Sequence, residues 1–139
     1  MNPPIILDTS AYLSLGTTSD SNHKKAIDIS GEIQVLGRSV IVPSDVFTEI
    51  INVVGKKEDH KRAVVQGQHL LSSKVFIISE TSSTIRLKAF EIFKKQPKSV
   101  SFTDCVVMSS ADHFETKEIF GFDEAFKKNG YVRFGIDKS

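Results

Sequence analysis

Short apolar runs, separated by longer stretches with helical periodicity, constrain the fold of this chain more than any other feature of its sequence. Each run is rich in Ile, Val or Phe. The runs lie at residues 5–7, 40–42, 75–78, 118–122 and 131–134. A short continuous apolar run is typical of a strand that is buried on both faces, which is the environment of strands in a parallel sheet.

The stretches between the runs have the periodicity of amphipathic helices. Helices are predicted over residues 9–15, 22–35, 44–55, 58–72, 81–95, 101–114 and 125–128. Strands that alternate with helices predict an α/β fold, in which helices cover both faces of a parallel sheet. The chain has no internal repeat or linker, and its 139 residues are close to the commonest size of one domain. Residues 1–139 are therefore predicted to form a single domain.

The balance of charge excludes a protein that coats nucleic acid with a strongly basic surface. The chain carries 18 basic and 17 acidic side chains, for a formal net charge of +1. Three lysine pairs, among them Lys56-Lys57, are candidate phosphate contacts, although solvated helix ends explain such pairs more often. A role on nucleic acid would therefore depend on local charge and on metal ions.

Cys105 is the single cysteine, which excludes an intramolecular disulfide and a zinc site built of thiolates. No stretch approaches the roughly 20 apolar residues of a membrane span, and the N-terminal sequence lacks the pattern of a signal peptide. These features predict a cytoplasmic protein that makes no membrane contact.

Two aspartates follow apolar runs. Asp8 comes directly after the run 5–7, and Asp123 comes directly after the run 118–122. Ligands of open parallel sheets bind at the carboxyl ends of the strands, so both carboxylates are expected on the binding side. Taken alone, each of these residues is explained more often as a helix cap or a turn residue.

Two further carboxylates lie on predicted helices. Glu49 lies about 60° around its helix from Val46 and borders the apolar stripe, where an unpaired carboxylate costs several kcal/mol unless its pKa rises. Asp104 completes a capping pattern with Ser101, but the helix that follows is apolar on two sides and is expected to be deeply buried. Taken singly, a Glu at a helix edge and a capping Asp are the simpler explanations.

Taken together, the four carboxylates indicate a metal site. Crowded carboxylates repel each other and raise each other's pKa unless a cation holds them. Hard oxygen ligands without His or Cys companions favour Mg²⁺ or Mn²⁺ over zinc. The 4 histidines of the chain show no spacing typical of a metal site or a catalytic triad.

Four segments, in this order along the chain, resemble the acidic motifs of PIN-domain ribonucleases. The segments are Ile5-Ile6-Leu7-Asp8-Thr9-Ser10, residues 42–50, Ser101-Phe102-Thr103-Asp104 and residues 120–126. The resemblance covers essentially the whole chain. Small single-domain members of this length resemble the VapC-type toxins of toxin–antitoxin pairs.

The resemblance implies a three-layer α/β/α sandwich with a mostly parallel five-stranded sheet. It also implies a Mg²⁺- or Mn²⁺-dependent endoribonuclease that cleaves RNA, forms a homodimer and is blocked by a cognate antitoxin. The catalytic and metal-binding residues that it carries over are Asp8, Glu49, Asp104 and Asp123. Ser10 and Thr103 fall where family members often have a hydroxyl or amide near the metal, and helix capping explains these two residues equally well.

Other functions compete with this one. Haloacid-dehalogenase-type phosphatases need a second Asp two residues after the first, where this chain has Ser10, and response-regulator receivers need an acidic pair that is absent after Leu7. Two alternatives within the fold are a nuclease that processes ribosomal or transfer RNA without an antitoxin, and a catalytically silent binding module. The presence of all four acids weighs against the silent module.

Overall fold

The structure is a computed structural model, and it describes residues 2–138. Across these residues five strands form one sheet in the order β3-β2-β1-β4-β5, and every neighbouring pair is parallel. The strands are β1 (Ile5–Leu7), β2 (Val40–Pro43), β3 (Phe76–Ser79), β4 (Glu118–Phe120) and β5 (Val132–Arg133). The predicted α/β class is confirmed, and the sheet is parallel throughout.

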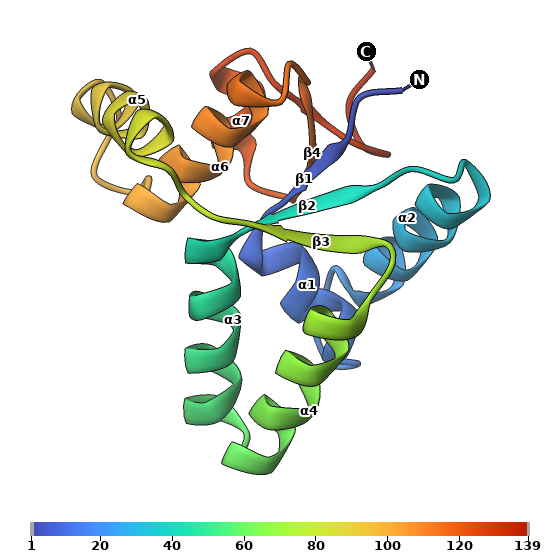
Figure 1. The fold of residues 1–139 in the computed structure, drawn as a ribbon. Helices are drawn as coiled ribbons and strands as arrows, with labels where there is room; N and C mark the ends of the chain where they lie inside the picture. The colour runs from blue at the N-terminus through green and yellow to red at the C-terminus, as the bar shows by residue number, and fades with distance from the viewer. Residues whose placement is uncertain (1, 139) are drawn as a thin grey trace.

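Within the described residues, seven helices connect the strands and cover both faces of the sheet (Figure 1). One face carries α1 (Thr9–Gly16), α2 (His23–Val35), α3 (Ser44–Lys57) and α4 (His60–Ser72). The other face carries α5 (Ser83–Lys94), α6 (Phe102–His113) and α7 (Glu124–Lys128). This arrangement is the predicted three-layer α/β/α sandwich. None of these helices has the length and apolar content needed to cross a membrane.

The core lies around the central strand β1 and the helix α6. Every residue of β1 is fully buried, and α6 packs on β1, β2 and β4. All side chains of α6 from Cys105 to Ala111 are buried, which confirms the prediction that this helix is deeply buried. At the sheet edge, β3 is only partly covered, and Ile77 is exposed.

The strand order reverses at β1, and this reversal defines the position of the site. β2 and β3 lie to one side of β1, whereas β4 and β5 lie to the other. The Asp8 amide donates a hydrogen bond to the carbonyl of Phe120 at 2.9 Å, so β1 and β4 stay together up to their carboxyl ends. In open α/β sheets, ligands bind in the crevice at such a reversal point.

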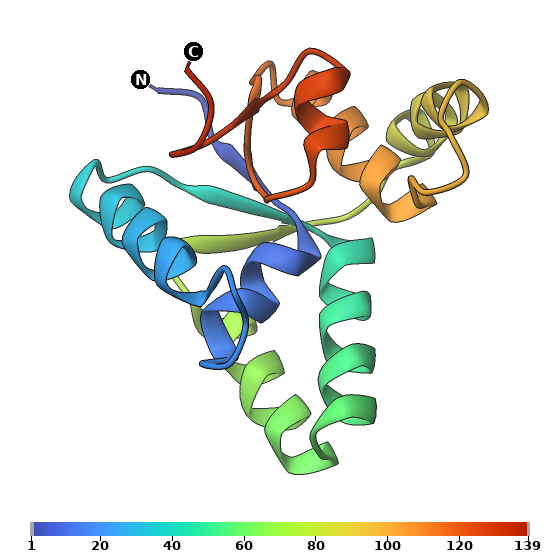
Figure 2. The same cartoon turned by 180° about the vertical axis from the view of Figure 1, so that it is seen from behind.

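The helices α3 and α4 form a hairpin that extends away from the sheet (Figure 2). The two helices approach closely at Gly67, where an added Cβ would lie 3.2 Å from Cδ1 of Ile51. On α4, Ala63, Gly67 and Leu70 are buried as the periodicity predicts. Leu71, which the same pattern places on the apolar face, is exposed instead.

Candidate active site

Asp8 is held at the end of the central strand. The residue occupies the N-cap position of α1, but its side chain makes no capping hydrogen bond, so the helix-cap explanation is wrong here. Asp8 is only 4% exposed, and its Oδ2 accepts a hydrogen bond from Ser10 Oγ at 2.5 Å. Ser10 therefore orients the carboxylate instead of capping a helix.

Burial raises the pKa of Asp8 to about 7, because a carboxylate that is removed from water is destabilised in its charged form. Hydrogen bonds from Ser10 oppose this shift, and the negative charges of Asp104 and Glu49 add to it. The proton of Asp8 is thus held weakly near neutral pH. A cation beside this carboxylate would displace the proton and stabilise the charged form.

Asp104 lies in the first turn of α6, where it completes the predicted capping box. Its amide donates to Ser101 Oγ at 3.1 Å, and its Oδ2 accepts from the Ser101 amide at 2.9 Å. Burial nevertheless raises the pKa of Asp104; hydrogen bonds from Ser101 oppose the shift, while the charges of Asp123 and Glu49 add to it. Capping and a place in the acidic cluster therefore coexist.

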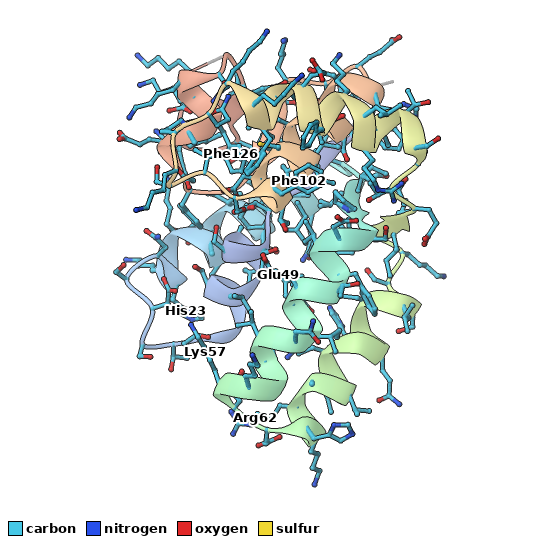
Figure 3. All side chains as sticks on the ribbon, turned by 90° about the vertical axis from the view of Figure 1, so that its left-hand side faces the viewer. His23, Glu49, Lys57, Arg62, Phe102 and Phe126 are labelled. Carbon is cyan, nitrogen blue, oxygen red and sulfur yellow. The ribbon has the colours of Figure 1, made fainter. Side chains whose placement is uncertain are left out.

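Glu49 is half-buried on α3. Figure 3 shows it on the part of α3 that lies nearest the start of α6, which Phe102 marks. Its negative charge acts on both Asp8 and Asp104. The stripe-edge position predicted for Glu49 thus brings it to the same site as these two residues.

Asp123 is the most loosely connected of the four acids. It is exposed and caps α7, with its Oδ1 accepting from the Ala125 amide at 2.8 Å. β4 ends at Phe120, so Asp123 does not follow the strand directly, as the apolar run suggests. Its charge still acts on Asp104, and the four predicted carboxylates are therefore brought together with Asp104 as the shared neighbour.

A hollow of about 570 Å³, which we call the acidic hollow, opens beside this cluster. Its lining residues are Ser44, Asp45, Thr48, Glu49, Asn52, Glu80 and Thr103. Thr103 therefore faces the hollow beside Glu49, while Ser101 provides the cap of α6. Two carboxylates of this wall, Asp45 and Glu80, are not among the predicted site residues. Glu80 directly follows β3, and the rule that selected Asp8 could have found it.

Gly121 is a further residue of the site that is not among the predicted ones. A Cβ at this position would lie 2.9 Å from the Cβ of Asp8 and 2.9 Å from the ring of Phe126. A side chain here would push Asp8 out of place, so the glycine permits the close approach of two segments distant in sequence. The only local signal is a glycine at the end of an apolar run.

The chemistry of these side chains suits a hard cation, because the donors are carboxylate and hydroxyl oxygens. Among residues 2–138, however, no group of three or more His, Cys, Asp or Glu side chains is close enough to hold a metal ion directly. Mg²⁺ keeps much of its hydration in proteins. The carboxylates that would hold such an ion, directly or through water, are those of Asp8, Glu49 and Asp104.

Comparison with known proteins adds a family and a fold. The family model of the PIN domain matches residues 5–130. No curated protein matches the sequence. Among solved structures that match is the VapC20 toxin of Mycobacterium tuberculosis, described as cleaving the sarcin–ricin loop. It is 21% identical with a TM-score of 0.78, and the match covers 92% of this chain and 96% of that chain. A likeness at this level of identity shows the fold.

Proposed function

The chain belongs to the PIN domain family, and from this premise we propose that it is a metal-dependent endoribonuclease with a single catalytic domain. The observation that carries the proposal is the state of Asp8. A buried carboxyl group with a pKa raised to about 7 lies at the reversal point of the sheet, beside Asp104 and Glu49, and caps no helix. Perturbed carboxyl groups of this kind are typical of functional sites.

We assign the binding of Mg²⁺ or Mn²⁺ to Asp8, Asp104 and Glu49, with Asp123 as an outer ligand. When bound, such an ion would polarise a phosphate of RNA and lower the pKa of a water molecule that attacks it. Ser10 fixes the direction of the Asp8 carboxylate through its hydrogen bond. The capping box fixes Asp104 at the start of the rigid helix α6, so two of the proposed ligands are oriented before any ion arrives.

Within this class we propose the toxin of a VapC-type toxin–antitoxin pair, acting in the cytoplasm as a homodimer. The likeness to the M. tuberculosis toxin, over nearly the full length of both chains, supports this assignment. The proposed antitoxin is a protein whose tail occupies the acidic site. A processing nuclease without an antitoxin, and a silent binding module, are the alternatives.

The test combines substitutions of single aspartates with two measurements. Asp8→Asn removes the charge at nearly constant size, and we expect it to abolish Mn²⁺-dependent RNA cleavage by the purified protein and growth arrest on expression. Asp104→Asn should act in the same way. Asp28→Asn, on the exposed face of α2, is the matched control and should leave both measurements unchanged.

Each alternative predicts a different result. Cleavage without growth arrest, or arrest that the neighbouring upstream gene fails to relieve, would favour a processing nuclease. Absence of cleavage together with no Mn²⁺ binding in calorimetry would favour a binding module. An Asp8→Asn protein that cuts RNA as fast as the parent would refute the proposed site.

A further inference from the structure

A polar stripe runs along α3 from the acidic hollow toward the tip of the α3–α4 hairpin. At about 100° per residue its members fall within about 60° of one another, because they are spaced four, three and four residues apart. The stripe consists of Asp45, Glu49, Asn52 and Lys56. The buried residues of the helix, Val46, Ile50 and Val54, lie on another side.

The stripe connects two hollows of opposite character. The first is the acidic hollow, which contains Asp45, Glu49 and Asn52. The second, which we call the hairpin groove, has a volume of about 900 Å³ and lies between α3 and α4. Its lining residues are Phe47, Ile51, Asn52, Gly55, Lys56, His60, Ala63, Val64, Gly67, Gln68 and Leu71. Asn52 lines both, so the two hollows adjoin at this residue.

The charge changes sign along the stripe. The acidic hollow is lined by three carboxylates, whereas the described residues that line the hairpin groove include Lys56 and His60 and no carboxylate. Lys56 and Asn52 are both exposed, and among residues 2–138 neither side chain has a hydrogen-bond or ion-pair partner in the protein. Glu49 and Lys56 are separated by about 10.5 Å of helix rise.

We propose that this stripe is the path of the RNA strand, with one phosphate at Lys56 and an unpaired base in the hairpin groove. The inference rests on the proposed ribonuclease function. A separation of about 10.5 Å corresponds to about three nucleotides at roughly 3.4 Å each along a stacked strand, and to fewer where a base is unstacked. Lys56 therefore holds a phosphate no more than about three nucleotides from the one that is cut.

The lining of the groove specifies the form of the RNA. Phe47 and His60 offer ring surfaces beside aliphatic side chains, and unstacked bases bind against such surfaces. Bases inside a duplex are paired and stacked and cannot enter a groove of this kind. The substrate is therefore single-stranded or looped RNA, positioned by Lys56 and by hydrogen bonds from the Asn52 amide.

Lys57 provides a matched control within the same helical turn. It has the same charge, is exposed and lies in the last turn of α3, so its effect on the helix dipole and on net charge is the same. It points about 100° away from Lys56 around the helix. Figure 3 shows Lys57 on the side of α3 that faces His23.

The experiment measures binding separately from cleavage. Binding of a fluorescein-labelled, unstructured RNA of about 12 nucleotides is followed by anisotropy over a range of salt, in the Asp8→Asn background. We expect Lys56→Ala to weaken binding roughly fivefold and to reduce the slope of log K against log salt by about 0.7, the value for one phosphate contact on a single strand. Lys56→Arg should retain binding, and Lys57→Ala should change neither quantity.

In the protein with Asp8 intact, Lys56→Ala should raise KM and leave kcat unchanged. Equal effects of Lys56→Ala and Lys57→Ala, or unchanged RNA binding in Lys56→Ala, would overturn the inference while cleavage by the parent still supports the ribonuclease. Unchanged RNA binding in Lys56→Ala would also be expected if the groove bound a protein partner. Equal affinity for a duplex of the same sequence would overturn the unpaired base. A parent protein that neither binds nor cleaves RNA would refute the proposed function itself.

Discussion

At the scale of single residues, the burial of Asp8 makes the folded and unfolded chains differ in how tightly they hold one proton. The unfolded carboxyl group has a pKa of 3.8, and burial raises the pKa of Asp8 in the folded protein to about 7. Between these values the folded protein binds more protons than the unfolded chain. Its stability in the absence of metal therefore falls as the pH rises between these two values.

We predict that the metal-free protein loses stability as pH rises from about 4 to about 7. The upper limit of the loss is about 4 kcal/mol, from roughly three pKa units at about 1.4 kcal/mol each. Denaturant unfolding at both ends of this range, in the presence of EDTA, measures the effect. Asp8→Asn should remove most of it, and Mn²⁺ should restore stability at the upper pH, because metal binding displaces the proton. Stability that is constant or rises with pH would contradict the assignment.

Gly121 permits a contact that no other residue allows. We predict that Gly121→Ala costs about 1–3 kcal/mol of stability, the usual range for an added methyl group in a packed site, and reduces RNA cleavage, because the new Cβ meets Asp8 and Phe126. Thermal unfolding and a cleavage assay measure both effects. Gly31→Ala is the control: a Cβ there meets nothing within 4 Å, and in the middle of α2 it should stabilise the protein slightly. Similar stability changes in the two variants would contradict the role of Gly121.

At the scale of helices and strands, periodicity predicts most of the fold, because the central strands β1 and β2 are buried and most helices bury one face. The prediction fails where a long-range contact decides the local structure. The apolar run 118–122 predicts a strand up to Phe122, but β4 ends at Phe120. The Arg133 guanidinium donates to the carbonyl of Phe122 at 2.8 Å and is itself paired with Asp137. Nothing within the run indicates this contact, which holds the segment before Asp123.

In the candidate site, too, local patterns predict some residues, and contacts between distant segments decide the others. Asp8, Glu49 and Asp104 could be predicted because each stands beside an apolar run or stripe, where a carboxylate is unusual. Asp45 and Glu80 were not predicted as site residues. Glu80 follows β3 as Asp8 follows β1, but its approach to Asp45 depends on β2 and β3 being neighbours, and no local pattern gives the strand order. The family resemblance placed the four acids in one site.

At the scale of the whole molecule, the outer surface of α5 exposes apolar side chains that no other part of residues 2–138 covers. Leu87 is 70% exposed and Phe90, three residues further along the same face, is 51% exposed. Figure 1 shows α5 at the periphery, packed against α6. Neighbouring exposed apolar side chains mark interaction surfaces, so this face supports the proposed homodimer.

We predict that the protein sediments as a dimer and that Leu87→Lys shifts it toward the monomer, because a charge would have to be buried in the interface. Analytical ultracentrifugation at several concentrations measures the change. Val35→Lys, at an 87% exposed position at the end of α2, should leave the dimer intact. A monomeric parent protein, or equal effects of the two substitutions, would contradict dimerisation through α5.

The central position of β1 has a consequence for folding during synthesis. β1 has β4 as its neighbour, and the amide of Asp8 reaches its partner only when Phe120 is present. Pairing between such distant segments comes late in folding, because the long intervening loop must be closed first. In a nascent chain, Asp8 therefore lacks its β4 partner until Phe120 has left the ribosome. We therefore expect the proposed ribonuclease to remain inactive while its own chain is being synthesised.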